Sequence, residues 1–255
     1  MSLPLAFLSE FGDALKFLVQ QRESVTGGAQ IGGSEVWLEF LPRHLLLTGV
    51  SVGVACAIAI PLALWLGHIG RGEVIATSVS NVGRAVPSLA LIAFFVAYLG
   101  VGFTNVTLAL VLLAIPPILT NTYVGVRQVD SEVVDSARGM GMSGTNIVRR
   151  VELPLALPLI FSGVRTSVVN VVATATIAPL AGYITLGSPI IEANVYGEAG
   201  RLGASIVVAA LAVACEFAFG ALERAVTPRG LKLRSGSEPR RRTIPFPQRR
   251  AQATP

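Results

Sequence analysis

A window of 42 residues, from 85 to 126, contains no Lys, Arg, Asp or Glu. Two shorter windows, 44–70 and 166–191, are also free of these charges. A helix needs roughly 20 apolar residues to cross a bilayer, so the longest window predicts two crossings. The apolar runs are continuous and do not alternate as barrel strands do, which favours helices. Only 14% of the chain is charged, against about 25% in soluble domains, so the chain is predicted to lie in a membrane.

We therefore predict an all-α, polytopic membrane protein with five spans. Pro87 should kink the second span, because proline removes a helical hydrogen bond. Residues 3–20 carry three charges and are predicted to form an amphipathic helix at the membrane surface. The expected organisation is an N-terminal segment 1–40, a transmembrane domain 41–227 and a disordered basic tail 228–255. The predicted spans are 44–68, 74–100, 104–126, 155–178 and 201–222.

Basic residues predict the orientation of the chain. The loop 127–150 contains four arginines, and the tail 228–255 contains eight Lys or Arg against one Glu. That tail carries +7 while the whole chain carries +5, so the remainder carries −2. Cytoplasmic loops of membrane proteins are enriched in Lys and Arg. The sequence thus predicts a multi-pass protein of the plasma or inner membrane, with an outside N-terminus and a cytoplasmic C-terminus.

Several kinds of chemistry are not expected in this chain. Its two lysines, Lys16 and Lys232, are followed by Phe and Leu, so neither fits the phosphate-binding G-x-x-x-x-G-K-[ST] loop. Cys56 and Cys215 lie in separate apolar spans, which favours neither a disulfide nor a metal site. We predict no catalytic residues, no bound metal and no enzyme activity. The basic tail should contact anionic lipid rather than nucleic acid.

The loop between the third and fourth spans has a helical pattern from 130 to 140. Polar residues suited to a helix start stand at 130–132, and three glycines at 139, 141 and 144 permit the chain to turn afterwards. A short amphipathic helix in such a loop can dock into a groove of a partner protein. Its apolar positions recur at steps of three and four: Val133, Val134, Ala137 and Met140.

This loop resembles the cytoplasmic signature of ABC importer permeases, which is Glu-Ala-Ala, three residues, Gly, nine residues, then Ile-x-Leu-Pro. All spacings agree, with Asp, Ser and Val replacing the first Glu, the first Ala and the Ile. The resemblance implies that this loop is the coupling helix that binds a separate ATPase. The matching residues are Asp135, Ser136, Ala137, Gly141, Val151, Leu153 and Pro154.

The wider resemblance is to the osmoprotectant importer permeases, on the stretches 86–91, 116–125, 163–167 and 173–177. It implies uptake of glycine betaine, choline, carnitine or proline. It also implies a cytoplasmic ABC ATPase that binds the ATP, an extracytoplasmic solute-binding protein and a second permease, identical or paralogous. No cofactor is then needed in this chain. The turn 182–187 keeps only part of the family's Gly-Leu-Gly pattern.

Two other functions are compatible with a polytopic chain. One is an importer permease of the same architecture for an amino acid or methionine. The other is a secondary transporter or channel that works without ATP. Many secondary transporters carry internal repeats, which this sequence does not show.

Polar residues in the fourth span form a candidate translocation path. Ser167, Asn170 and Thr174 step by three and four, so they share one helix face. Polar side chains inside spans often mark substrate paths, although they also hydrogen-bond neighbouring helices. Arg165 is a fourth candidate for the path and is expected near the cytoplasmic end, either as a gating residue or as an anchor. Glu216 is expected to pair with an arginine such as Arg165 or Arg84.

Overall fold

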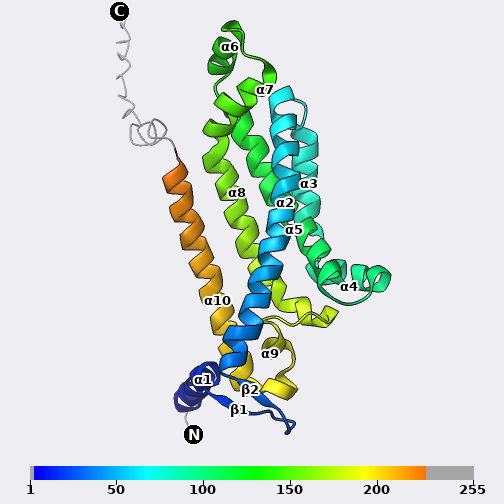
Figure 1. Ribbon diagram of the computed structural model, residues 1–255, viewed down its shortest axis with the longest axis vertical. Helices are drawn as coiled ribbons and strands as arrows, with labels where there is room; N and C mark the ends of the chain where they lie inside the picture. Colours follow the sequence, from blue (N-terminus) through cyan, green and yellow to red (C-terminus); the bar gives the residue numbers. More distant parts are fainter. Residues whose placement is uncertain (1–2, 228–255) are drawn as a thin grey trace, which may run out of the picture.

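The computed structural model describes residues 3–227, so the predicted tail 228–255 lies outside the described residues (Figure 1). Helices dominate this part of the chain, as predicted. Its elements in chain order are α1 (Leu3–Val19), β1 (Gln21–Glu23), β2 (Gln30–Gly32), a π-helical turn η1 (Val36–Phe40), α2 (Leu41–Ile69), α3 (Glu73–Ala85), α4 (Ser88–Leu99), α5 (Phe103–Arg127), α6 (Ser131–Gly139), α7 (Gly144–Ile147), a π-helical turn η2 (Val148–Glu152), α8 (Leu153–Thr174), a 3-10 segment η3 (Ala175–Ala181), α9 (Ser188–Ile191) and α10 (Ala193–Val226).

The helix α5 lies at the centre of an elongated bundle and packs against α2, α3 and α8 (Figure 1). The helix α10 packs along α8 on the outer side. The short helices α6 and α7 lie at one end, and the N-terminus lies at the other. Four stretches of helix in the described chain are long and apolar enough to cross a membrane: Val36–Ile69, Phe103–Arg127, Gly144–Ala181 and Ala193–Val226.

The predicted second span, 74–100, is not one continuous helix. It is divided into α3 and α4, and Pro87 between them is extended, with φ −66° and ψ 122°. A proline disfavours helical geometry in the residue before it, here Val86, so the break has a local cause. In Figure 1, α4 projects sideways from the bundle while α3 stays beside α2 and α5. Three of the other predicted spans lie within single α-helices, and 155–178 runs from α8 into η3.

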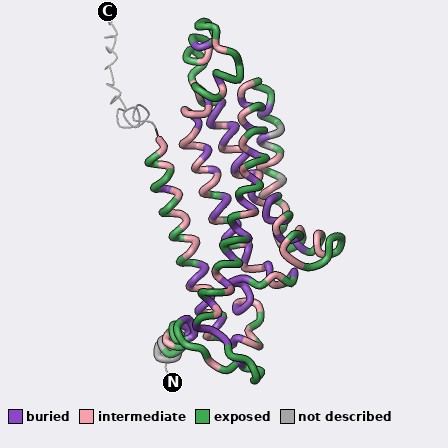
Figure 2. The backbone as a smooth tube through the Cα atoms, viewed as in Figure 1, coloured by how far each residue is buried: buried purple, intermediate pink, exposed green. Residues whose placement is uncertain are grey.

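Buried alanines let α2 pack closely against its neighbours, α5 and α8. Ala55, Ala59 and Ala63 recur every four residues on α2, and none has any exposed surface. Without a hydrophobic driving force between helices in lipid, such small residues let backbones come close and gain packing contacts. Figure 2 shows the buried residues concentrated along the middle of the bundle. The described core is thus built around α5.

The end of the bundle opposite α6 is closed by the N-terminal segment. The helix α1 packs on the start of α10, where the Phe17 and Tyr196 rings meet edge to face at 6.4 Å. The strands β1 and β2 pair antiparallel, with Arg22 opposite Ile31. The predicted helix at 3–20 is therefore present as α1. Phe17 is buried while Val19 is exposed, so α1 has one packed and one open face.

Candidate functional site

The coupling segment

The helix α6 has a capping group at each end. The Asp130 side chain accepts a hydrogen bond from the Glu132 backbone N–H at 3.0 Å, which satisfies a free donor of the first turn. At the other end, the Gly141 N–H donates to the Arg138 carbonyl at 3.0 Å and the Met142 N–H donates to the Ala137 carbonyl at 3.2 Å. These two bonds, with a left-handed Gly141 at φ +82°, form a Schellman motif. The sequence prediction of a helix stopped by glycine is confirmed.

The apolar stripe of α6 is only partly covered by the rest of the chain. Ala137 is buried, whereas Val133 is 45% exposed and Met140 is 76% exposed. A groove of about 390 Å³ runs between α6 and η2. Three residues of the signature line it: Ser136, Ala137 and Val151. This end of the bundle therefore presents an apolar, concave surface of the kind that protein partners fill.

The remaining signature residues have different surroundings. Asp135 is exposed and pairs with Arg138 at 3.2 Å on the same helix, a contact worth little in water. Leu153 packs against a small buried cluster at the start of α8, and Pro154 occupies the first turn of that helix. Because η2 runs directly into α8, Pro154 lies inside a longer run of helix, where π-helical geometry changes to α-helical geometry.

A buried carboxylate that the sequence analysis did not single out lies beside the signature. The Glu152 side chain is 5% exposed, and its two oxygens lie 2.9 and 3.0 Å from Nδ1 of His68. His68 belongs to the end of α2, so this contact joins two segments 84 residues apart. The sequence gives one indication of this buried carboxylate, because Glu152 is a charged residue between Val151 and Leu153 of the signature.

The cleft between α3, α5 and α8

A cleft of about 580 Å³ opens between α3, α5 and α8. Its described lining is hydroxyl, amide and apolar, with no charged side chain among the described residues that line it. Two of the predicted path residues, Asn170 and Thr174, contribute to this lining. The polar residues that line it are Ser80, Ser88, Thr120, Asn121, Thr166, Asn170 and Thr174.

Ser167, predicted on the same path, lies elsewhere. It is fully buried, and its hydroxyl donates to the Ala114 carbonyl of α5 at 2.8 Å. Its neighbour Thr166 lines the cleft instead. Residues three or four apart lie on the same broad face of a helix but do not point in the same direction. The cleft borders only the part of this face that carries Asn170 and Thr174. Ser167 therefore joins two helices, which is the alternative left open by its sequence position.

Two adjacent prolines shape the α5 wall of the cleft. Pro116 and Pro117 both line it, and neither has a backbone N–H to donate to the preceding turn. The Asn121 side-chain amide donates to the Pro117 carbonyl at 2.8 Å. Gly163 of α8 lies so close that an added Cβ would be 2.8 Å from that same carbonyl. The crossing of α5 and α8 at the cleft thus depends on small and proline residues.

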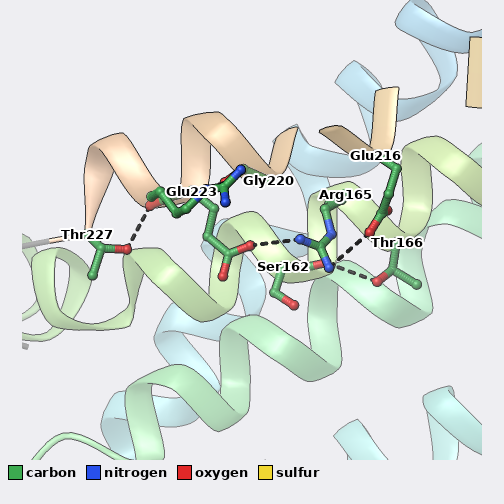
Figure 3. Close-up of polar contacts among 8 residues, drawn as sticks. Ser162, Arg165, Thr166, Glu216, Gly220, Glu223 and Thr227 are labelled. Atoms are coloured by element: carbon green, nitrogen blue, oxygen red, sulfur yellow. Dashed lines mark hydrogen bonds and ion pairs between the residues drawn. The ribbon is translucent and has the colours of Figure 1, made fainter. Parts of the chain in front are cut away.

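Arg165 faces α10 rather than the cleft. Its guanidinium lies between two carboxylates, with Nη2 at 3.1 Å from Glu216 and Nη1 at 3.3 Å from Glu223 (Figure 3). The expected pairing of Arg165 with Glu216 is therefore present, and Glu223 is a second partner. Charged side chains inside a bundle usually pair in this way. Arg165 therefore links α8 to α10 through ion pairs with two glutamates of α10.

Similarity to known proteins

The sequence profile of the family described as "Binding-protein-dependent transport system inner membrane component" matches residues 59–230. The glycine betaine/carnitine/choline transport system permease protein OpuCB of Bacillus subtilis is 36% identical over 191 residues, which are 74% of this chain and 88% of the relative. The carnitine transport permease protein OpuCB of Listeria monocytogenes is 38% identical over 198 residues, or 77% of this chain and 91% of the relative.

Solved structures share the fold at lower identity. An inward-facing structure of the MetNI methionine ABC transporter has a TM-score of 0.66 at 21% identity, covering 78% of this chain and 100% of that chain. An amino acid ABC transporter with histidines has a TM-score of 0.58 at 19% identity, covering 75% of this chain and 92% of that chain. The helical arrangement is therefore that of ABC importer permeases.

Proposed function

Because this chain belongs to the binding-protein-dependent transport inner-membrane component family, and is thus the permease subunit of an importer, we propose that it carries osmoprotectants across the membrane. The proposed substrates are quaternary ammonium or zwitterionic osmolytes such as glycine betaine, carnitine, choline or proline. The observation that carries this proposal is the identity to osmoprotectant permeases along three quarters of the chain.

The chemistry of the cleft agrees with such substrates. Its described lining offers hydroxyl and amide groups and no charge. Glycine betaine, carnitine and proline are zwitterions with no net charge and need no counter-ion, whereas choline carries one positive charge that this lining does not neutralise. Transport also requires binding weak enough for the solute to leave. We propose that Asn170 and Thr174 line the path, together with Thr166 and Asn121. Ser167 is not proposed to touch the solute, because its hydroxyl is occupied by Ala114.

The proposed mechanism divides the work between subunits. The family works with an ATPase and a solute-binding protein, and the second permease is either an identical or a paralogous chain. We propose that the ATPase docks on the groove between α6 and η2, where Val133 and Met140 are exposed. A short turn at 140–143 joins α6 to the helical stretch from Gly144 to Ala181, so a push on α6 is expected to reach the cleft wall of α8 through this turn. Rigid-body motion of helices is a known route of switching.

Uptake by the reconstituted transporter tests the substrate. We expect vesicles holding this permease, its ATPase and its binding protein to accumulate radiolabelled glycine betaine, carnitine or choline when ATP is supplied. Methionine and histidine serve as matched competitors, since permeases of this fold also carry amino acids. Uptake of an amino acid but of no osmolyte would contradict the proposed substrate, and osmolyte uptake without ATP would contradict the proposed energy source.

We also propose that the α6 end of the bundle is cytoplasmic and the N-terminal end is outside. The four arginines of 127–150 lie at the α6 end, and positive residues favour the cytoplasm. Reporter fusions after Arg150 and after Arg234 should both report a cytoplasmic location. A fusion after Gln30, at the opposite end, should report the outside, and an external signal from either of the first two fusions would contradict this orientation.

A further inference from the structure

We propose that His68 is a positioning residue that ties the coupling segment to α2, so that ATP-driven motion of α6 reaches both walls of the cleft. The inference rests on the proposed function, since it assigns a role within ATP-coupled transport. The coupling segment here means residues 131–152, which include α6, α7 and η2. The backbone joins the coupling segment directly to α8. In the described chain, the coupling segment also contacts α2 through the side chain of His68.

His68 bonds to the coupling segment at Glu152 and lies close to it at Gly144. Its Nδ1 lies 2.9 and 3.0 Å from the two carboxylate oxygens of Glu152, the last residue of η2. On the other side of the ring, Nε2 lies 3.0 Å from the position that a Cβ on Gly144 would occupy. Gly144 begins α7 and Glu152 ends η2. The imidazole therefore bonds to the end of this stretch at Glu152 and lies beside its beginning at Gly144.

Burial makes the contact with Glu152 specific. The Glu152 side chain is 5% exposed and that of His68 is 20% exposed. A buried carboxylate without a donor costs free energy, because water no longer solvates it. The Glu152 carboxylate has one side-chain partner described, His68. Displacing the coupling segment from α2 would leave this carboxylate without its donor, so the two segments should move together.

The end of α2 leads directly to the second wall of the cleft. After His68, α2 ends at Ile69, and the next residue, Gly70, is left-handed at φ +68°. Only Arg71 and Gly72 separate Gly70 from α3, and α3 supplies Ser80 and Gly83 to the cleft. A displacement of α6 therefore reaches the α8 wall through the backbone. It reaches the α3 wall through His68 and the short turn that follows.

The test measures solute transported per ATP hydrolysed in the reconstituted complete transporter. We expect His68→Ala to retain the ATPase, because α6 and its groove are unchanged, but to lower transport per ATP by about tenfold. Coupling between sites in proteins commonly corresponds to about 5–150-fold effects. The expected result is thus continued hydrolysis with little transport.

Two conservative variants separate positioning from packing. His68→Asn keeps an N–H donor at the place of Nδ1, whereas His68→Gln moves it to the place of Nε2. We expect His68→Asn to recover most of the transport per ATP and His68→Gln to recover little. Arg43→Ala is the matched control, since it removes an ion pair with Glu39 at the opposite end of the bundle, and it should transport as the wild type does.

Three outcomes would overturn the inference. One is equal transport per ATP in wild type and His68→Ala. The second is an equal loss in the Asn and Gln variants, which would make the effect one of packing alone. The third is loss of the ATPase from all His68 variants. The proposed function fails differently, through a wild-type transporter that takes up no osmolyte with ATP.

Discussion

Replacing Gly141 with Asp is expected to detach the ATPase and reduce solute uptake to background. Gly141 is the left-handed residue of the Schellman motif that ends α6. A residue with a Cβ costs roughly 1 kcal/mol or more in that conformation, Asp and Asn being the best tolerated after glycine. Apart from Gly141 and its two chain neighbours, no atom of the described chain lies within 4 Å of the added Cβ, so the cost is backbone strain rather than an internal clash. The chain can relieve that strain by unwinding the motif, which displaces Val133 and Met140.

A matched control is available two residues earlier. Gly139 is the last residue of α6, has no left-handed backbone and also has open space around its Cβ position. Gly139→Asp adds the same charge at the same helix end without the strain. Since 1.4 kcal/mol corresponds to about tenfold in affinity, ATPase co-purification should fall by about tenfold or more for Gly141→Asp and much less for Gly139→Asp. Equal retention of the ATPase by both variants would remove α6 as the docking element.

Replacing Asn170 with Trp is expected to stop uptake while the ATPase remains bound and active. Asn170 lines the cleft of about 580 Å³ and is exposed within it. The indole ring would occupy the space between α3, α5 and α8 and would replace an amide with an apolar surface. The coupling segment lies at the end of the bundle and is untouched. Uptake and ATP hydrolysis should therefore be measured together in the same vesicles.

The control for this substitution is Val213→Trp. Val213 lies on α10, is 54% exposed and is absent from the described cleft lining. The Val213→Trp substitution adds the same indole ring to a membrane-spanning helix, but at a position away from the cleft. We expect the control to transport at nearly the wild-type rate. Normal uptake by Asn170→Trp would place the translocation path elsewhere, and loss of the protein from the membrane in both variants would show only a general intolerance of Trp.

Most of the fold could be predicted from charge-free windows, because lipid leaves helices as the only solution for such continuous apolar runs. The division of 74–100 into α3 and α4 could be predicted only in part. Pro87 signals a disruption, but whether a helix bends or breaks depends on the contacts around it. Here α4 packs on α5 and η3 after the break, and this tertiary contact has no counterpart in the local sequence.

The candidate sites were predictable where the signal is local. The end of α6 follows from glycine chemistry, and Gly141 is left-handed as a helix-stopping glycine should be. Long-range pairs were not predictable. Ser167 and Thr166 are neighbours in sequence, yet only the position of α5 decides which one faces the cleft. The pairing of His68 with Glu152 likewise depends on how α2 meets η2.

Cross-linking from α6 to the ATPase tests the central claim most directly. In a chain whose Cys56 and Cys215 are replaced by Ala, a single cysteine at Met140 would carry a photoactivatable label. Met140 is 76% exposed, and Leu38, in the η1 turn directly before α2, is 79% exposed and provides the control position. We predict that light joins the Met140 position to the ATPase subunit and that the Leu38 position gives no such product. An ATPase cross-link from Leu38, or none from Met140 in a transporter that retains its ATPase, would contradict the assignment of α6 as the coupling helix.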